Sequence, residues 1–429
     1  MLRGNTQEVE ILTLEDCLRI GIDNNLSLEG KRKEIQKSKY GVSENRSKLL
    51  PQINAIAGYN NNFDPPVSVT DGSSYGVPYN ITKTLQHSAN AGLEMQMPLF
   101  NQTLYTSMSI AKVMEEISRL SYGKAREDVI LQISKMYYLG QVTAEQIMLI
   151  KANITRLEEL RDITRAFFDN GMSMEVDLKR VNINLENLKV QYDNAQAMMK
   201  QQLNMLKYIM DYPAEKEIAL TPVNADSITT VALTGLSENI YELQLSQSQV
   251  QLAERQKKII TNGYIPSLSL TGSWRYAAYT DKGYHWFHSG PSNQWFRSYG
   301  VGLTLRIPIF DGLDKTYKIK KAMIDIENKR LAWEDARKNL QTQYLNAVND
   351  LMNNQRNFKK QKDNYLLAED VYAVTSDRYR EGIASMTEVL QDEMQMSEAQ
   401  NNYISAHYNY RVTNLMLLKL TGQIESLVK

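Results

Sequence analysis

Apolar and polar residues alternate in two stretches of the first half of the chain and in two stretches of the second half. The apolar positions fall on alternate residues within 53–59, 93–99, 268–276 and 301–307. A period of two predicts β-strands with one apolar face. The opposite face is polar and carries Asn54, Asn60, Glu94, Gln96, Ser269, Thr271, Arg275, Thr304 and Arg306. A strand between lipid and a water-filled lumen has this pattern, and so has the edge of a soluble β-sandwich.

The two halves of the chain are related by an internal repeat. LPQINAIAGY, starting at Leu50, resembles IPSLSLTGSW, which starts 215 positions later at Ile265. GLEMQMPLF, starting at Gly92, resembles GLTLRIPIF, which starts 210 positions later at Gly302. This self-similarity predicts two equivalent halves, and the change in offset indicates a length difference in the loop between the strands.

The segments between the strands of each half are predicted to be exposed loops. Residues 61–88 and 277–298 are rich in Asn, Pro, Gly and Ser. The aromatic residues in or beside them include Tyr75, Tyr79, Tyr279, Tyr284, Trp286, Trp295 and Tyr299. Aromatic residues at the ends of strands are typical of a membrane interface, and ordinary packing is the alternative.

Most of the remaining chain has the composition of long helices. From about 102 to 169 and from about 313 to 380 there is no Pro and little Gly, which predicts two helices of roughly 100 Å at 1.5 Å per residue. A stripe with spacings of three and four residues runs along each helix. Its members are Ile133, Met136, Gly140, Thr143, Ile147, Ile150, Ile154 and Leu157, and, 211 positions later, Tyr344, Ala347, Leu351, Asn354, Phe358, Gln361, Tyr365 and Ala368. Since polar residues interrupt both stripes, a wide tube of laterally packed helices is favoured over a tight two-stranded coiled coil.

Each long helix is followed by a turn and a returning helix. Gly171 and Gly382 lie in these turns and fit helix C′ caps with positive φ. The returning helices are predicted at about 175–211 and 385–420, and shorter helices at about 14–48 and 236–262 precede the strands of each half.

Composition narrows the class of protein. Lys+Arg and Asp+Glu number 49 each, so no overall charge attracts nucleic acid. No window approaches ~18 uninterrupted apolar residues, which excludes a membrane-spanning α-helix and leaves strands as the elements for any membrane role. Cys17 lies in an apolar-periodic stretch and is predicted to be a buried small hydrophobe. The first residues lack the apolar region of a signal peptide, so an exported protein is expected to be shown here already processed.

The four predicted strands cannot form a closed structure in lipid by themselves. An open sheet edge there leaves backbone groups unpaired. Closure therefore requires further copies: two would give eight strands and three would give twelve, and strand number alone does not choose between them.

Several motifs in a fixed order point to one family. They are LTLEDCLR starting at Leu12 with Asn24 and Asn25 after it, Leu50-Pro51, PIFDG starting at Pro308, Tyr379-x-x-Gly382, and Glu388-Val-Leu390. Over nearly its whole length the chain resembles the TolC-like outer-membrane efflux proteins, or outer membrane factors. The resemblance implies a mainly α fold with a membrane β-barrel part, in which a homotrimer forms a 12-stranded β-barrel on a 12-helix periplasmic α-barrel with a closable inner end.

The resemblance implies a protein of the bacterial outer membrane with most of its chain in the periplasm, and it divides the chain into six segments. They are N-terminal periplasmic helices (1–49), a first transmembrane β-hairpin with its extracellular loop (50–100), a first pair of long and returning helices (101–212), a connector with the first helix of the second repeat (213–263), a second transmembrane hairpin (264–310) and a second helix pair with the C-terminus (311–429).

The resemblance also implies partners and residues that contact them. The expected partners are a periplasmic adaptor (membrane fusion) protein, an inner-membrane pump and outer-membrane lipid. The adaptor is expected to dock on the helix-turn tips, at Asn170, Gly171, Met172, Glu381, Gly382 and Ile383. Simple helix capping is the alternative role of these turns.

Acidic residues close to the tips are candidates for a gate. Helices that converge on one axis would bring copies of a carboxylate into a ring that selects cations. Glu388 matches the gate acid of the family, and Glu175 is its proposed counterpart in the first half. Asp392 or Glu393 would add a second ring of carboxylates. Tyr379 matches a residue that latches the closed end in the family. Ala384 and Gln391 replace an Arg and an acid of the family's best-known gate, which argues against an identical latch. A solvated helix face is the alternative for each charge.

The sequence shows no catalytic constellation. P-loop, dinucleotide-binding, nucleophile-elbow and HExxH motifs are absent, and His285 and His288 lack further ligands at zinc-like spacing. We therefore predict no enzyme activity, no cofactor and no nucleic-acid partner. The predicted function is the passive outer-membrane exit duct of a tripartite efflux assembly. The alternatives are the outlet of a type I protein-secretion system and, in another class, a soluble coiled-coil scaffold.

Overall fold

A computed structural model describes residues 10–71, 73–222, 235–281 and 294–428. The chain contains two units. Unit 1 comprises Met1–Ile35, Ser118–Gln247 and Leu331–Lys429, and unit 2 comprises Gln36–Ile117 and Ser248–Arg330. Each half of the repeat contributes to both units, because the long helices α3 (Gln102–Asp169) and α6 (Asp314–Arg380) begin in unit 2 and end in unit 1.

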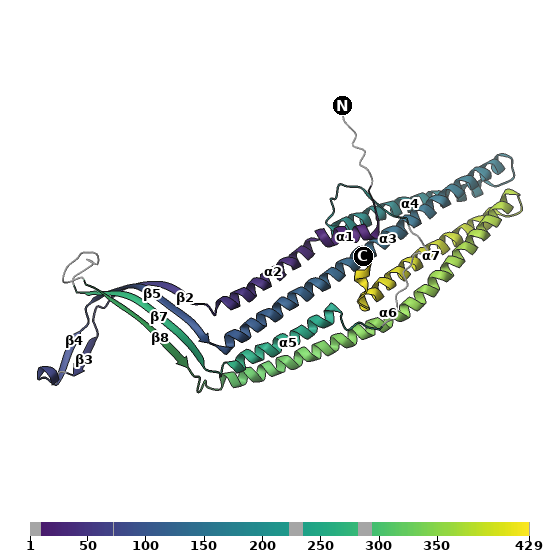
Figure 1. Cartoon of the computed structure of the whole chain (residues 1–429). Coiled ribbons are helices and arrows are strands. Elements are labelled where there is room, and N and C mark those ends of the chain that lie inside the picture. Colours follow the sequence, from purple (N-terminus) through teal and green to yellow (C-terminus); the bar gives the residue numbers. More distant parts are fainter. Residues whose placement is uncertain (1–9, 72, 223–234, 282–293, 429) are drawn as a thin grey trace, which may run out of the picture. The chain divides into compact units, whose positions relative to one another are not determined.

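Unit 2 contains one antiparallel sheet that joins the two halves of the repeat. Its strands are β2 (Gln52–Asn61), β5 (His87–Phe100), β7 (Ser267–Thr280) and β8 (Trp295–Arg306), in the order β2-β5-β7-β8. Figure 1 shows them as four neighbouring curved arrows. The two predicted hairpins are therefore confirmed, and β5 pairs directly with β7.

The register places the apolar residues of all four strands on one face. Ile53 lies opposite Met95, and Leu93 lies opposite Trp274. Trp274 in turn lies opposite Tyr299. The polar residues share the other face, where Asn54 is paired with Glu94 and Glu94 with Ser273. Each strand thus has one apolar and one polar face, as the alternation predicted.

The predicted loop over 61–88 is not wholly irregular. It contains a second small sheet made of β3 (Val67–Asp71) and β4 (Tyr79–Lys83), joined through a short 3₁₀ turn, η1 (Ser73–Tyr75). Val69 is paired with Ile81 in this hairpin. The prediction overlooked it because Pro, Gly and Ser dominate the composition, although VSVT and YNIT alternate with period two. Tyr284, Trp286, His285, His288 and the side chain of Tyr75 lie outside the described part of the chain.

Among the helices that adjoin the sheet strands of unit 2, α5 (Tyr241–Asn262) contacts both α3 and α6. This helix begins later than the predicted residue 236. An ion pair of 2.7 Å between Glu254 and Arg330 joins α5 to α6. Asn262 at the end of α5 donates a hydrogen bond of 2.6 Å to Thr106 Oγ1 on α3. The helix ends next to the sheet are therefore held together by polar contacts.

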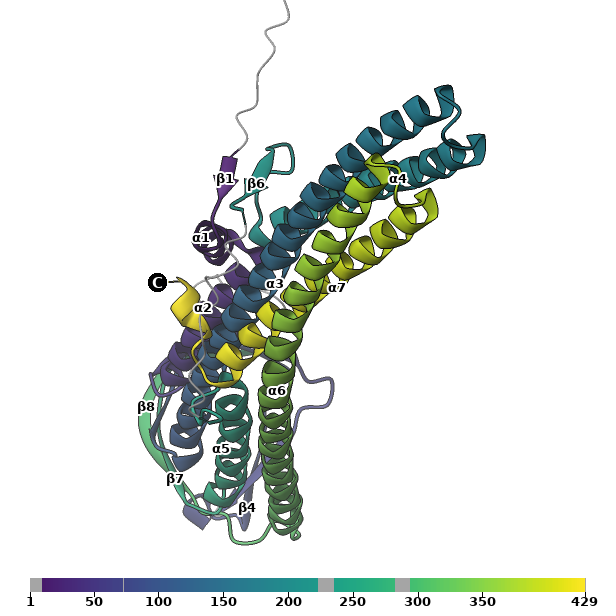
Figure 2. The ribbon, with the colours of Figure 1, turned by 90° about the vertical axis from the view of Figure 1, so that its right-hand side faces the viewer.

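Unit 1 is built from two helical hairpins. The long helix α3 turns back into α4 (Glu175–Met210), and α6 turns back into α7 (Met386–Leu420), as Figures 1 and 2 show. The members of both predicted stripes are buried or half-buried. Two large apolar clusters fill the unit: one includes Ile130 and Leu415, and the other, nearer the turns, includes Leu157 and Val389. None of the helices within the described ranges has the length and apolar character needed to cross a membrane.

The N-terminal helix is divided in two. The predicted helical range of 14–48 contains a break that the prediction did not place, because α1 (Leu14–Asn24) ends before Asn25 and α2 (Leu26–Ser47) begins after it. The Asn25 side chain accepts a hydrogen bond from the Leu28 amide at 3.1 Å and donates one to the Ile209 carbonyl at 2.7 Å. This side chain caps the new helix and ties it to α4.

A short parallel pair links the two ends of the first repeat. It consists of β1 (Glu10–Leu12) and β6 (Ile218–Leu220), and α7 is followed by a 3₁₀ turn, η2 (Ile424–Val428). Cys17 on α1 is fully buried, as predicted, and this burial raises the pKa of its thiol to about 12.

Candidate functional site at the helix-turn ends

The two helix turns of unit 1 have the same backbone structure. In the first, the Met172 amide donates to the Phe167 carbonyl at 2.8 Å and the Gly171 amide to the Phe168 carbonyl at 2.9 Å. Gly382 and Ile383 repeat this pair of bonds 211 positions later, at 2.9 and 2.8 Å. The glycines have φ of 73° and 74°. Both turns are therefore Schellman motifs, which need a left-handed residue at C′, and the predicted caps are confirmed.

The residues predicted to contact an adaptor lie on these turns and are exposed. Met172 and Ile383 expose 67% and 63% of their surface, and Asn170 and Glu381 are also exposed. Two apolar side chains at equivalent positions of the repeat thus reach solvent in this chain. An apolar residue at this position of a Schellman motif usually packs on the preceding turn, whereas these two side chains leave most of their surface in solvent.

The returning helices begin differently in the two halves. In α7, Ser385 Oγ accepts from the Glu388 amide at 3.3 Å, and the Glu388 carboxylate accepts from the Ser385 amide at 2.8 Å. In α4 the equivalent residue is Met174, which makes no side-chain cap. The hydrogen bonds from Ser385 lower the pKa of Glu388, which is exposed and ionised at neutral pH.

Two acidic residues at the start of α4, Glu175 and Asp177, are candidates for the first-half counterpart of Glu388. Glu175 is the first residue of α4 and pairs with Lys179 at 2.8 Å, and the hydrogen bond from Lys179 lowers its pKa. Asp177 is the third residue of α4, as Glu388 is of α7, and pairs with Arg180 at 3.3 Å. By position in the helix, Asp177 is the structural equivalent of Glu388.

Tyr379 joins the two hairpins inside unit 1. Its hydroxyl, buried within the apolar cluster near the turns, donates to Thr164 Oγ1 at 3.2 Å, and its ring lies 5.6 Å from that of Phe167. Burial raises the pKa of Tyr379, which stays neutral and keeps its donor proton. Thr164 was not singled out from the sequence, although it continues the α3 stripe seven residues beyond Leu157.

The two acids considered for a second ring have different surroundings. Asp392 is half-buried, whereas Glu393 is 5% exposed and its Oε1 has no hydrogen-bond partner among the described residues. Desolvation raises the pKa of Glu393, and the nearby Arg156 partly opposes this rise. Glu393 points into the packed core, so its position does not suit a ring of exposed carboxylates.

Charged residues also connect α3 to α6. Arg380 pairs with Glu159 at 3.3 Å, and Arg156 pairs with Glu369 at 3.5 Å. They line a cavity of about 310 Å³ together with Tyr372 and other α6 residues. Between α4 and α7, Arg180 donates to Thr387 Oγ1 at 3.4 Å. These polar contacts add to the apolar cluster that joins the two hairpins.

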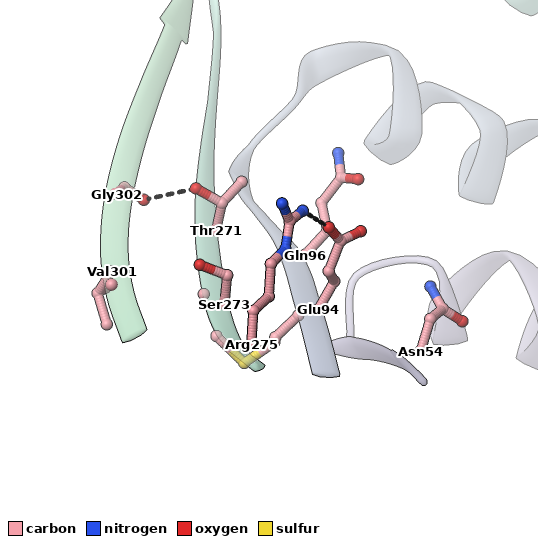
Figure 3. A pocket seen from close by; sticks show the side chains of 11 residues that line it. Asn54, Glu94, Gln96, Thr271, Ser273, Arg275, Val301 and Gly302 are labelled. Carbon is pink, nitrogen blue, oxygen red and sulfur yellow. Dashed lines mark hydrogen bonds and ion pairs between the residues drawn. The ribbon is translucent and has the colours of Figure 1, made fainter. Parts of the chain in front are cut away.

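A second polar surface lies on the sheet of unit 2. Asn54, Glu94, Gln96, Thr271, Ser273 and Arg275 line a hollow of about 400 Å³ on its polar face. Figure 3 shows the ion pair between Glu94 and Arg275 and the bond from Thr271 Oγ1 to the Gly302 carbonyl, which measures 3.2 Å. Gly300 and Gly302 leave the floor of this hollow open, since they carry no side chain.

The family model described as outer membrane efflux protein matches residues 20–210 and 234–423. The chain belongs to the outer membrane efflux protein family. The predicted resemblance is confirmed, and the protein is an outer-membrane efflux channel by family. The family is one of efflux channels and is not known as an enzyme family.

Named members of the efflux family match over most of their length. The outer membrane protein TolC of Vibrio cholerae is 21% identical over 396 residues, which cover 89% of this chain and 84% of that protein. The probable efflux pump outer membrane protein TtgC of Pseudomonas putida is 23% identical over 379 residues, or 83% and 75% of the two chains. These relatives are outer membrane proteins.

Solved structures of outer-membrane channels share the fold. A CusC structure superimposes with a TM-score of 0.79 at 15% identity and covers 98% of this chain and 95% of CusC. The MtrE channel of Neisseria gonorrhoeae gives a TM-score of 0.75 at 18% identity, with 95% and 88% covered. The mainly helical, two-repeat architecture of the efflux family is therefore confirmed for this chain.

Proposed function

We propose that three copies of this chain form one exit duct through the outer membrane, with a 12-stranded β-barrel on a 12-helix periplasmic α-barrel. The observation that carries this proposal is the sheet β2-β5-β7-β8. Its apolar face is solvent-exposed in the single chain, and no described strand pairs with the outer edges of β2 and β8. Lipid would cover such a face, and further copies would pair such edges.

Pairing β8 of one copy with β2 of the next closes the sheet. Three copies give twelve strands, within the range of membrane barrels. The polar face would then line a water-filled lumen that contains the Glu94–Arg275 ion pair. Residues 50–100 and 264–310 are the proposed membrane-spanning hairpins with their extracellular loops.

The helices of the three copies would continue the duct into the periplasm. Segments 1–49, 101–212, 213–263 and 311–429 supply this part. A periplasmic adaptor would dock on the turns, where Met172 and Ile383 are exposed, and would connect the duct to an inner-membrane pump. The pump would supply the energy, and the duct would conduct small molecules passively, without enzyme activity or cofactor.

The gate would form where the hairpins converge. Glu388 is exposed and ionised. Three Glu388 carboxylates around one axis would therefore repel one another and attract cations. Asp392, Glu175 and the latch residue Tyr379 complete the proposed gate. Because Tyr379 bonds to Thr164 within one copy, it would hold the two hairpins of that copy together during opening.

The test is the oligomer mass in detergent combined with single-channel conductance in planar bilayers. We expect a trimer with a small conductance, and we expect Glu388→Gln to change its cation preference. Glu186→Gln, further along α4 and outside the proposed gate, serves as a control that removes one carboxylate from the other returning helix. A monomer or dimer that gives no conductance would overturn the duct and favour a coiled-coil scaffold.

A further inference from the structure

The junction between helices and sheet is basic in the second half of the repeat and neutral in the first. Residues 255–262 and 311–321, next to the start of β7 and the end of β8, contain seven basic and two acidic residues. The equivalent segments 40–47 and 101–111 contain one basic and one acidic residue. Since the halves otherwise match, this charge difference is specific to the second junction.

Two large apolar residues at the same junction are almost fully exposed. Ile309 and Phe310 expose 94% and 81% of their surface. Their equivalents 210 positions earlier, Leu99 and Phe100, expose 41% and 44%. Exposed apolar residues beside the apolar face of a membrane strand are typical of the bilayer interface.

The basic residues lie close to the helix ends that adjoin the sheet. We call Lys257, Lys258, Lys318, Lys320 and Lys321 the junction lysines. They lie within about eight residues of the helix ends that adjoin the sheet, which is roughly 12 Å or less at 1.5 Å per residue. The headgroup layer beside the hydrocarbon core is roughly 5–8 Å thick.

Several of the junction lysines are available to an external anion. Lys318 pairs with Asp314 at 2.7 Å, and Lys320 lies 5.6 Å from the ring centre of the exposed Tyr317. No ion pair to Lys257, Lys258 or Lys321 occurs within the described ranges. Lys257 and Lys258 also line a groove of about 810 Å³, in which three basic and two acidic side chains border Met323 and Ile326.

We propose that the junction lysines, with Ile309 and Phe310, bind the headgroups of anionic phospholipids in the membrane leaflet on the helical side of the sheet. The apolar pair would enter the acyl region, and the lysines would contact lipid phosphates. A second copy of the chain fits this surface less well. Its first-half junction, which would come next to this one on ring closure, carries no excess of acidic residues.

This inference rests on the proposed membrane position of the sheet. In the test, the full-length protein in mild detergent is mixed with equal amounts of phosphatidylglycerol and phosphatidylcholine, and the retained lipids are quantified. The test variant is Lys318/Lys320/Lys321→Gln, and Lys318/Lys320/Lys321→Arg is the charge-preserving variant. The control, Lys359/Lys360/Lys362→Gln, removes the same charge from α6 about 60 Å further along the helix.

We expect the wild type, the Arg variant and the control to retain phosphatidylglycerol preferentially, and the test variant to lose about tenfold or more of this preference. Equal retention of both lipids by a wild type that conducts in bilayers would overturn the lipid inference and leave the duct standing. A wild type that neither inserts nor conducts would overturn both. If Phe310→Ser dissociates the trimer without changing the lipid preference, the surface is an interface between copies, and the inference is wrong.

Discussion

Glu388 and Glu393 lie five residues apart on α7, and their pKa values are shifted in opposite directions. Glu388 is exposed and its pKa is lowered by the hydrogen bonds of the capping box, whereas the pKa of Glu393 is raised by burial. The difference arises from the faces of the helix on which they lie. One faces solvent at the N-terminus, and the other faces the apolar cluster that joins the hairpins.

The two glutamates are expected to give opposite pH dependences of local stability. A lowered folded-state pKa adds stability above the unfolded pKa, and this is lost as the pH falls through the folded value. Glu388→Gln should therefore destabilise the first turn of α7 at neutral pH and have little effect in acid. A carboxyl whose pKa is raised in the folded state lowers the stability of that state as the pH rises above the unfolded-state pKa. Glu393→Gln should therefore stabilise the hairpin at neutral pH, and it should have no such effect at a pH below the unfolded-state pKa.

Hydrogen exchange of the α7 amides, corrected for the intrinsic pH dependence, measures both effects. The first turn reports on Glu388, and the middle turns report on Glu393. Parallel responses of the two variants to pH would contradict the assignment. Gln keeps the size and polarity of Glu, so each variant changes little except the titration.

At the scale of elements, the two helix turns were predicted well because their signals are local. A glycine after a long apolar-periodic stretch is enough to indicate a Schellman motif. The division of the N-terminal helix at Asn25 was missed: its cap on the Leu28 amide is local, but the bond that ties Asn25 to the Ile209 carbonyl is remote in sequence. The β3–β4 hairpin was missed because its alternation is short and its composition is that of a loop.

The turn glycines should respond to substitution in the opposite sense to a helical glycine. Gly171 and Gly382 have positive φ, so Gly382→Ala should destabilise the turn by about 1–2 kcal/mol. Gly41 lies inside α2 with no atom within 4 Å of an added Cβ, and Gly41→Ala should stabilise its helix by about 0.5–1 kcal/mol. Local hydrogen-exchange protection distinguishes the two outcomes, and a loss of protection in Gly41→Ala would contradict this account.

At the scale of the whole molecule, the sheet has two distinct faces that predict distinct roles. Apolar side chains such as Val301 and Leu303 are exposed on one face, and the hollow around Glu94 and Arg275 lies on the other. In a water-soluble protein an apolar face of this extent would be an aggregation site. In an outer membrane efflux protein it is the surface expected to contact lipid.

Arginine placed on either face of β8 tests this assignment. Val301→Arg lies on the apolar face and is expected to cost up to about 2–4 kcal/mol, with less assembled protein in the outer membrane. Thr304→Arg lies on the polar face and should assemble normally while changing the channel conductance. Heat-modifiable oligomer in membrane fractions and bilayer conductance provide the measurements. Equal loss of assembly in both variants would show that the two faces are not distinguished by lipid.

The sequence by itself determined the order of the long helices and of the four strands of the large sheet, the two-fold repeat, the faces of the strands and the capped turns, because these depend on spacing and capping within a few residues. Only the tertiary structure decided that β5 pairs with β7, that Tyr379 bonds to Thr164 and that Glu393 is buried while Glu388 is exposed. These features depend on which remote segments meet. Contacts between residues so remote in sequence arise from packing and desolvation of the whole unit, which no local period records.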